Sequence, residues 1–451
     1  MVSPSSTSAE PRSRPQVFLH VGAAKSGTTY LQNVLWHNRD RLREHGVLFP
    51  GADAAAHVRA AFDLRRTFFP GASDPEVPGA WPRLVDEIRG WPGTVIVSQE
   101  LFAPAWRKTV RRAMADLDFA DVHVLFTARD LARQIPAHWQ EDVKNRYDVS
   151  FAEFVNQLKR PNWLDFELSR LFWALQDPVY VLERWAENLP PERVRVVTLP
   201  RPGAPRDLLW RRFCAAAGLV PDDYDLAAPF DNPSLGLAET QYLLRLNRMV
   251  GAGRLDWHLY NEEVKLFLAQ EVLAARPSAV KMTLPAEHLP WASERAAETV
   301  EGLRAARYRV VGDLDELIPG AGPGAAPDPD EPCWADVADV GMEAITALLT
   351  RLRDEEDRAA RIVEPEIPDA DLLDMLASRA EELRELTGAL TAASVPLARR
   401  AVRKAGERYP AVQQLRGAYW RLHGLAARSE TARSGTARPG AERSDADTKG
   451  R

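Results

Sequence analysis

The sequence predicts an α/β protein in which a parallel sheet is flanked by helices, followed by an α-helical appendage at the C-terminal side. Short apolar runs rich in β-branched residues recur between helix-like stretches, the pattern typical of this class. These runs are almost continuously apolar, as expected for strands that are buried on both faces. With 45% hydrophobic residues and 13 tryptophans among 451 residues, the chain can bury a large core.

The order of the predicted elements follows from these runs and from the amphipathic stretches between them. Strands are expected at residues 17–22, 95–98, 122–128 and 194–199, and residues 308–312 are either a late strand or a packing turn. Apolar residues recur at helical spacing in 28–43, 132–146, 151–158, 208–217, 238–250, 261–275 and 293–306.

The composition changes along the chain indicate five regions. Residues 1–15 are Ser/Pro-rich and predict a flexible arm, residues 16–320 form the α/β domain, and residues 321–332 form a Pro/Gly linker. Residues 333–428 have helical periodicity, which predicts an αα-hairpin or a partner-binding appendage. Residues 429–451 contain no large apolar residue, and we expect them to be disordered.

Charge and cysteine content narrow the function classes. The net charge of −6 argues against a generic nucleic-acid binder, which needs an excess of Lys and Arg. Residues 394–428 are locally basic, which predicts either a solvated helical face or contact with a membrane surface or an acidic partner.

The two cysteines, Cys214 and Cys333, give neither a disulfide framework nor a Cys-built zinc site, and the N-terminus lacks a secretory pattern. We therefore expect a cytoplasmic protein of unknown oligomeric state.

The most informative segment is the first predicted strand with the loop and helix that follow it. Gly22 and Gly27 have the spacing of the phosphate loop GxxxxGK[ST], and Thr29 stands at its hydroxyl position. However, Thr28 occupies the position of the usual lysine, and Lys25 lies within the loop. Amides at a helix start bind anions, and a displaced lysine favours one phosphate that carries a transferable group over a magnesium-bound triphosphate.

This loop, Gly-Ala-Ala-Lys-Ser-Gly-Thr-Thr, resembles the 5′-phosphosulfate-binding loop of the sulfotransferases, including bacterial ones, which use 3′-phosphoadenosine-5′-phosphosulfate (PAPS) on a P-loop-NTPase-like fold. The resemblance implies PAPS as co-substrate, no metal, and a catalytic Lys25 that stabilises the departing phosphate oxygen. It implies cofactor binding by Ala24, Lys25, Ser26, Gly27, Thr28 and Thr29.

A second motif agrees with this resemblance. The predicted strand 122–128 is followed by Arg129, and in sulfotransferases a strand-end arginine and a serine eight positions later bind the 3′-phosphate of PAPS. Arg129 matches, but Ala137 stands where the serine would be. Arg133, His138 or an amide at the helix start are the candidate replacements.

Glu100 is the candidate base for the acceptor proton, because it follows the predicted strand 95–98 at the edge where open α/β sheets bind ligands. The alternatives are a carboxylate at a helix start or an ion pair with Arg107 or Lys108. His20 is expected to be a core or loop-orienting histidine, and no His/Asp/Glu set has metal-ligand spacing.

The function expected from these motifs is transfer of a sulfuryl group from PAPS to a hydroxyl or amine of an unidentified small-molecule acceptor, such as a carbohydrate or glycosylated metabolite. The alternatives are a P-loop small-molecule kinase and a non-catalytic, sulfotransferase-like binding protein. Acceptor recognition is expected in the loops 51–82 and 163–178, whose aromatic residues suit sugar stacking or core packing equally.

Overall fold

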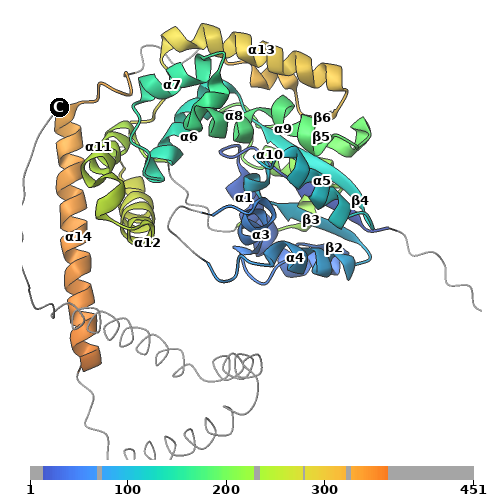
Figure 1. The fold of residues 1–451 in the computed structure, drawn as a ribbon, viewed down its shortest axis with the longest axis horizontal. Helices are drawn as coiled ribbons and strands as arrows, with labels where there is room; N and C mark the ends of the chain where they lie inside the picture. Colours follow the sequence, from blue (N-terminus) through green and yellow to red (C-terminus); the bar gives the residue numbers. More distant parts are fainter. Residues whose placement is uncertain (1–13, 69–73, 228–233, 278–279, 321–326, 364–451) are drawn as a thin grey trace, which may run out of the picture. The chain divides into compact units, whose positions relative to one another are not determined.

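A computed structural model describes residues 14–68, 74–227, 234–277, 280–320 and 327–363, and within these residues the fold is α/β (Figure 1). One sheet of six parallel strands has the order β2-β3-β1-β4-β5-β6. The strands are β1 Gln16–His20, β2 Val47–Leu48, β3 Thr94–Ser98, β4 Asp121–Ala128, β5 Val194–Thr198 and β6 Arg309–Val311.

The strand predictions agree with this sheet, with one omission. The segment 308–312 does contain a strand, which pairs with β5. The edge strand β2 was missed because two residues are too short to show any periodicity.

Helices cover both faces of the sheet (Figure 1). Phe18, Ile96 and Leu125 share a buried cluster with α1 (Thr28–His37), α2 (Arg39–Glu44) and α10 (Leu208–Ala217). Their strand neighbours belong to a cluster on the opposite face with residues of α3 Ala56–Arg65, α4 Ala80–Arg89, α5 Arg107–Asp116, α9 Pro178–Trp185 and α13 Leu289–Ala306. Burial on both faces is the reason for the unbroken apolarity of the strands.

A third buried cluster comes mainly from helices and contains no strand residue. It joins α6 (Leu131–Lys144) to α7 Phe151–Lys159, α8 Glu167–Gln176, α11 Leu237–Arg254 and the π-helix η5 Tyr260–Val272. Val340 and Ala344 of α14 (Trp334–Val363) are buried in the same cluster. Trp139 and Tyr260 are among its largest fully buried side chains.

Two predicted helices differ in detail. The stretch 28–43 is broken at Asn38, whose side-chain amide donates to the carbonyls of Val34 (2.9 Å) and Asp225 (2.8 Å) and so separates α1 from α2. The stretch 261–275 is wound mainly as the π-helix η5, followed by a 3₁₀ turn at Leu273–Ala275, and the sequence pattern alone does not distinguish these windings from an α-helix.

The predicted regions at the two ends are only partly covered by the described residues. The first of two compact units ends at Asp354, within α14, so the start of the predicted appendage belongs to that unit. Residues 1–13, 321–326 and 364–451 lie outside the described residues, and with them most of the predicted arm, half of the linker, the basic stretch 394–428 and the tail. Among the described helices, none has both the length and the apolar character needed to cross a membrane.

Candidate active site

The loop after β1 is held against β4 before it turns into α1. The amides of Val21 and Ala23 donate to the carbonyls of Leu125 (3.0 Å) and Thr127 (2.9 Å). Gly27 then has a φ of 84°, and a Cβ atom there would lie 2.4 Å from Leu209 Cδ2 of α10. Glycine is therefore required at position 27 both for the left-handed conformation and for the close packing.

Buried polar side chains of β1, β3 and β4 hold the loop after β1 in place through a hydrogen-bond network. His20 bonds through Nδ1 to the Ser98 hydroxyl (2.8 Å) and through Nε2 to the Thr127 hydroxyl (3.2 Å). The Ser26 hydroxyl donates to the Ala23 carbonyl (2.5 Å) and also contacts the Thr127 hydroxyl. Burial lowers the pKa of His20 to about 4, so its ring is neutral at pH 7. The side chains of His20 and Ser26 thus anchor the loop from inside.

The N-terminus of α1 is uncapped. Its N-cap residue is Gly27, which has no side chain to accept a hydrogen bond from the first turn. By contrast, Asp130 caps α6 by accepting from the amide of Arg133 (3.0 Å). The first-turn amides of α1 have no acceptor within their own helix, while the Thr28 side chain is buried and that of Thr29 is exposed. Free amides and the helix dipole give such a helix end the means to bind an anion.

Arg129 joins the second motif to this loop. It follows β4, and its Nη1 donates to the carbonyl of Lys25 (2.7 Å). Its buried Nε has no hydrogen-bond partner among the described residues. Burial lowers the pKa of Arg129 to about 10, so the guanidinium remains charged at neutral pH.

The sheet order explains why the two motifs meet. The connection after β1 runs toward β2 on one edge, while that after β4 runs toward β5 on the other. The strand order therefore reverses direction between the carboxyl ends of β1 and β4, and open α/β sheets bind ligands at such a switch point.

The side chain of Lys25 belongs to a charged cluster formed with residues of α6 and η5. Its Nζ lies 3.1 Å from Glu141 Oε2 of α6, and Lys144 and Lys265 lie 2.7 Å and 3.4 Å from the same carboxylate. Burial alone would raise the pKa of Glu141, but the three lysines outweigh it and hold the pKa well below its usual value. Three ammonium groups around one carboxylate leave a local excess of positive charge beside the loop.

The cluster around Glu141 was missed by the sequence analysis. Lys25 and Glu141 are 116 positions apart, and Lys265 comes from a third element, η5. No short motif connects them, so only the packing of α6 against the loop reveals the group.

The candidates for replacing the missing serine at Ala137 have different surroundings. The ring of His138 lies between Phe154 and Phe172 and accepts at Nδ1 from Gln176 (2.8 Å), within the helical cluster. Arg133 instead lies at the sheet edge, where it pairs with Asp130 and donates from Nη1 to the Pro200 carbonyl (3.1 Å), while its buried Nη2 has no partner among the described residues. The geometry favours Arg133 over His138.

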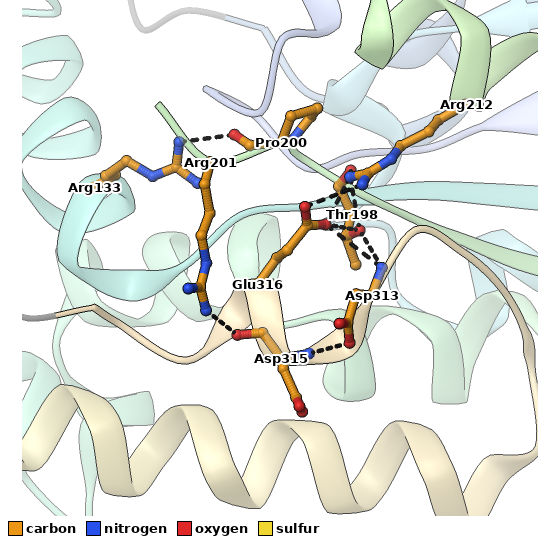
Figure 2. Close-up of polar contacts among 8 residues, drawn as sticks. All are labelled: Arg133, Thr198, Pro200, Arg201, Arg212, Asp313, Asp315 and Glu316. Atoms are coloured by element: carbon orange, nitrogen blue, oxygen red, sulfur yellow. Dashed lines mark hydrogen bonds and ion pairs between the residues drawn. The ribbon is translucent and has the colours of Figure 1, made fainter. Parts of the chain in front are cut away.

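At the end of the neighbouring strand β5, charged side chains pair with one another in a network (Figure 2). Arg212 of α10 makes two hydrogen bonds to Glu316, at 2.6 Å and 3.0 Å, and the Thr198 hydroxyl donates to the same carboxylate (2.5 Å). Arg201, which Figure 2 shows on the side of Arg133, donates to the Asp315 carbonyl (2.7 Å). The charge of Arg212 is thus neutralised internally, and we assign it a structural role.

Glu100 follows β3 at the carboxyl ends of the strands. It begins the 3₁₀ turn η1 (Glu100–Phe102), and its Oε2 accepts a hydrogen bond from Gln32 of α1 (3.0 Å). Arg107, a predicted alternative partner, lies beside Glu187 (3.5 Å) and Glu183 (3.8 Å) instead. The carboxylate is therefore half-buried beside the second turn of α1, on the side of the sheet order away from Arg129.

A cavity of about 80 Å³ is lined by Gln99, the chain neighbour of Glu100, and by Gln32, its hydrogen-bond partner. Its walls come from α1, from the segment between β2 and α3, from the start of α3 and from the end of β3. Gln32 both lines it and bonds Glu100. The lining residues are Gln32, Asn33, Trp36, Phe49, Asp53, Ala54, His57, Val58, Ser98 and Gln99. None of them is a lysine or an arginine.

Comparison with known proteins gave no match to a protein-family model, a curated protein or a solved structure. Within the described ranges, no group of three or more His, Cys, Asp or Glu side chains is placed to hold a metal ion.

Proposed function

We propose that this protein is a PAPS-dependent sulfotransferase with a P-loop-like fold that transfers a sulfuryl group to a hydroxyl of a small acceptor. The observation that carries the proposal is the hydrogen bond from Arg129 to the carbonyl of Lys25, because it brings the two sulfotransferase-like motifs together at the carboxyl edge of a parallel sheet. Neither motif alone is specific, but their meeting at a ligand-binding edge is what a nucleotide with separate 5′- and 3′-phosphates requires.

The donor is proposed to bind with its 5′-phosphate on the uncapped amides of α1. The hydroxyls of Thr28 and Thr29 add donors at the same helix end, and Gly27 allows the close approach of the loop backbone. Ser26 contributes through its backbone only, since its hydroxyl is bonded inward. The unpartnered Nε of Arg129 and Nη2 of Arg133 provide charged donors for the 3′-phosphate.

Lys25 is proposed to stabilise the leaving group. An ammonium group has three N–H donors, so Lys25 can keep its contact with Glu141 and still donate to the phosphate oxygen that gains charge. Because Glu141 fixes the amino group beside the loop, little reorganisation is needed during the reaction.

Glu100 is proposed as the general base. The acceptor oxygen forms a bond to sulfur while the bond between sulfur and the 5′-phosphate oxygen breaks, and the acceptor proton passes to the Glu100 carboxylate. The products are the sulfate ester and 3′-phosphoadenosine-5′-phosphate (PAP). Gln32 orients the carboxylate by its hydrogen bond (3.0 Å).

Binding of PAP to the full chain without metal, compared with ATP plus Mg²⁺, tests the proposal. A sulfotransferase binds PAP preferentially and transfers labelled sulfate from PAPS to a component of a cell extract. Preferential binding of ATP with Mg²⁺ would instead support a kinase. Tight PAP binding with no transfer to any acceptor would support a non-catalytic binding protein.

A further inference from the structure

The cavity beside Glu100 has polar walls whose unengaged groups are mainly side-chain amides. Both ring nitrogens of His57 are bonded to backbone groups, of Pro50 (2.9 Å) and Ser98 (3.3 Å), and Ser98 itself is bonded to His20. Asp53 is paired with Arg59 (2.7 Å). Within the described residues, this leaves the amide of Asn33, the amide nitrogen of Gln99, the amide oxygen of Gln32 and the indole N–H of Trp36.

Amides that both donate and accept match hydroxyl groups, which also do both. The Trp36 and Phe49 rings, which meet edge to face at 6.1 Å, provide an apolar wall for the carbon skeleton between such hydroxyls. The cavity volume of about 80 Å³ is room for several water-sized groups and so for part of a small polyol.

The charges around the cavity disfavour an anionic acceptor. Asp53 and Asp74 both pair with Arg59, Glu87 lies near Arg39, and Glu100 has no cationic partner within ion-pair distance among the described residues. The guanidiniums near the cavity are Arg59, Arg39, which lies 4.9 Å from the Trp36 ring centroid and donates to the Phe49 carbonyl, and Arg65, which donates to the Leu101 carbonyl. The four carboxylates therefore outnumber three guanidiniums that are already engaged, and an anion would meet a net negative surrounding.

An amine acceptor is disfavoured for a different reason. Carboxylates such as Asp53 and Glu100 stabilise the protonated form of a nearby amine, and an ammonium group has no lone pair for attack on sulfur. A hydroxyl has no such difficulty, because it is neutral before Glu100 removes its proton.

We propose that this cavity binds the acceptor, and that the acceptor is an uncharged polyhydroxy compound, such as a neutral glycoside, which presents one hydroxyl to Glu100. This inference rests on the proposed sulfotransferase function and adds to it the location of the acceptor site and its selection for neutral hydroxyl compounds. It also separates the two substrates by charge, since the donor is a polyanion bound on the lysine and arginine side of the loop.

The test compares methyl glucoside with methyl glucuronide, which has a carboxylate on the same ring, as acceptors of labelled sulfate from PAPS. Like charges facing each other across a site are costly, so we expect the neutral glycoside to have a kcat/KM at least about tenfold higher. The variant Asn33→Lys places a cation in the cavity wall and is expected to narrow this ratio, whereas the matched control Asn33→Gln is expected to keep it. PAP affinity is expected to be unchanged in both variants.

The outcomes distinguish this inference from the proposed function. Wild-type protein that prefers the glucuronide or an amino sugar, or an Asn33→Lys variant with an unchanged ratio, would overturn the acceptor assignment while sulfuryl transfer stands. Failure to bind PAP would instead contradict the sulfotransferase itself. Binding of methyl glucoside is also measured by saturation-transfer NMR without donor: binding that Asn33→Lys weakens supports the cavity assignment, and no binding overturns it.

Discussion

The two sides of α1, the helix that follows the loop after β1, differ sharply in charge. On one side, Lys25 and Arg129 lie against the loop, and Lys144 and Lys265 surround Glu141. On the other side, Glu100 is bonded to Gln32, which lines a cavity that has amide and aromatic side chains and no lysine or arginine in its wall. Both sides share α1, which contributes its N-terminal amides to the first and Gln32 to the second.

This difference suggests that the donor and the acceptor bind on opposite sides of α1. The cationic side suits a polyanionic donor and stabilises the charge that develops on its leaving oxygen. The neutral side suits an uncharged acceptor and keeps a carboxylate available to take its proton. Substitutions on the two sides should therefore affect different kinetic constants.

Replacement of Lys25 by alanine should have the largest effect. If the ammonium stabilises the departing oxygen mainly in the transition state, kcat should fall on the order of 10²–10³-fold, as for loss of one oxyanion donor. The measurement is single-turnover transfer of labelled sulfate from PAPS. The matched control is Lys159→Ala in α7, whose amino group lies near His288 (3.1 Å), and near-full transfer by Lys25→Ala would contradict the role of Lys25.

Replacement of Arg129 by alanine should act on donor binding. Loss of a charged hydrogen bond costs about 1.5–3 kcal/mol, so the Kd for PAP should rise roughly 10- to 100-fold. Calorimetry of PAP binding measures this, and Arg107→Ala is a control because that guanidinium is half-exposed and lies beside Glu187 and Glu183. Equal PAP affinities in the wild type and Arg129→Ala would remove the second motif from the donor site.

The cationic side could be predicted from sequence to the extent that it is local. Gly22, Lys25 and Gly27 lie within six consecutive residues, and strand, turn and helix each leave a recognisable pattern there. Arg129 was predicted in the same way, from the end of an apolar run. Glu141 and its two further lysines could not be predicted, because their meeting depends on how α6 and η5 pack and no periodicity encodes it.

The neutral side was predicted only at Glu100. Its cavity is built from α1, from the segment after β2 and from the end of β3, three pieces that meet only in the folded sheet. The strand β2 that positions one of these pieces has two residues and no pattern of its own. The segment 163–178, expected to be an acceptor-binding loop, instead contains the helix α8, and its Phe172 and Trp173 are buried in the helical cluster.

The smallest effect is expected from Glu141→Gln, which would remove the one carboxylate that the three lysines surround. Three lysines would then face a neutral amide, and we expect a loss of about 1–3 kcal/mol in the free energy of unfolding at pH 7, between the values for exposed and buried ion pairs. PAP should bind about three- to tenfold more tightly at low salt, because one negative charge near its phosphates is gone, and the gain should shrink as salt is added. Glu187→Gln, on an exposed ion pair with Arg111 (2.7 Å), is the control.

The pH dependence of this variant gives an independent check. The pKa of Glu141 is depressed in the folded protein, so its stabilising contribution is fully present above the ordinary carboxylate value of 4.5 and is lost as the pH falls through the folded value. The stability difference between wild type and Glu141→Gln should therefore be constant from pH 7 to about pH 5 and shrink only below 4.5. Chemical denaturation across this range measures it. A difference that is absent at pH 7, together with unchanged PAP affinity at low salt, would mean that Glu141 does not balance the charge of Lys25, and the contrast between the two sides of α1 would have to rest on Arg129 alone.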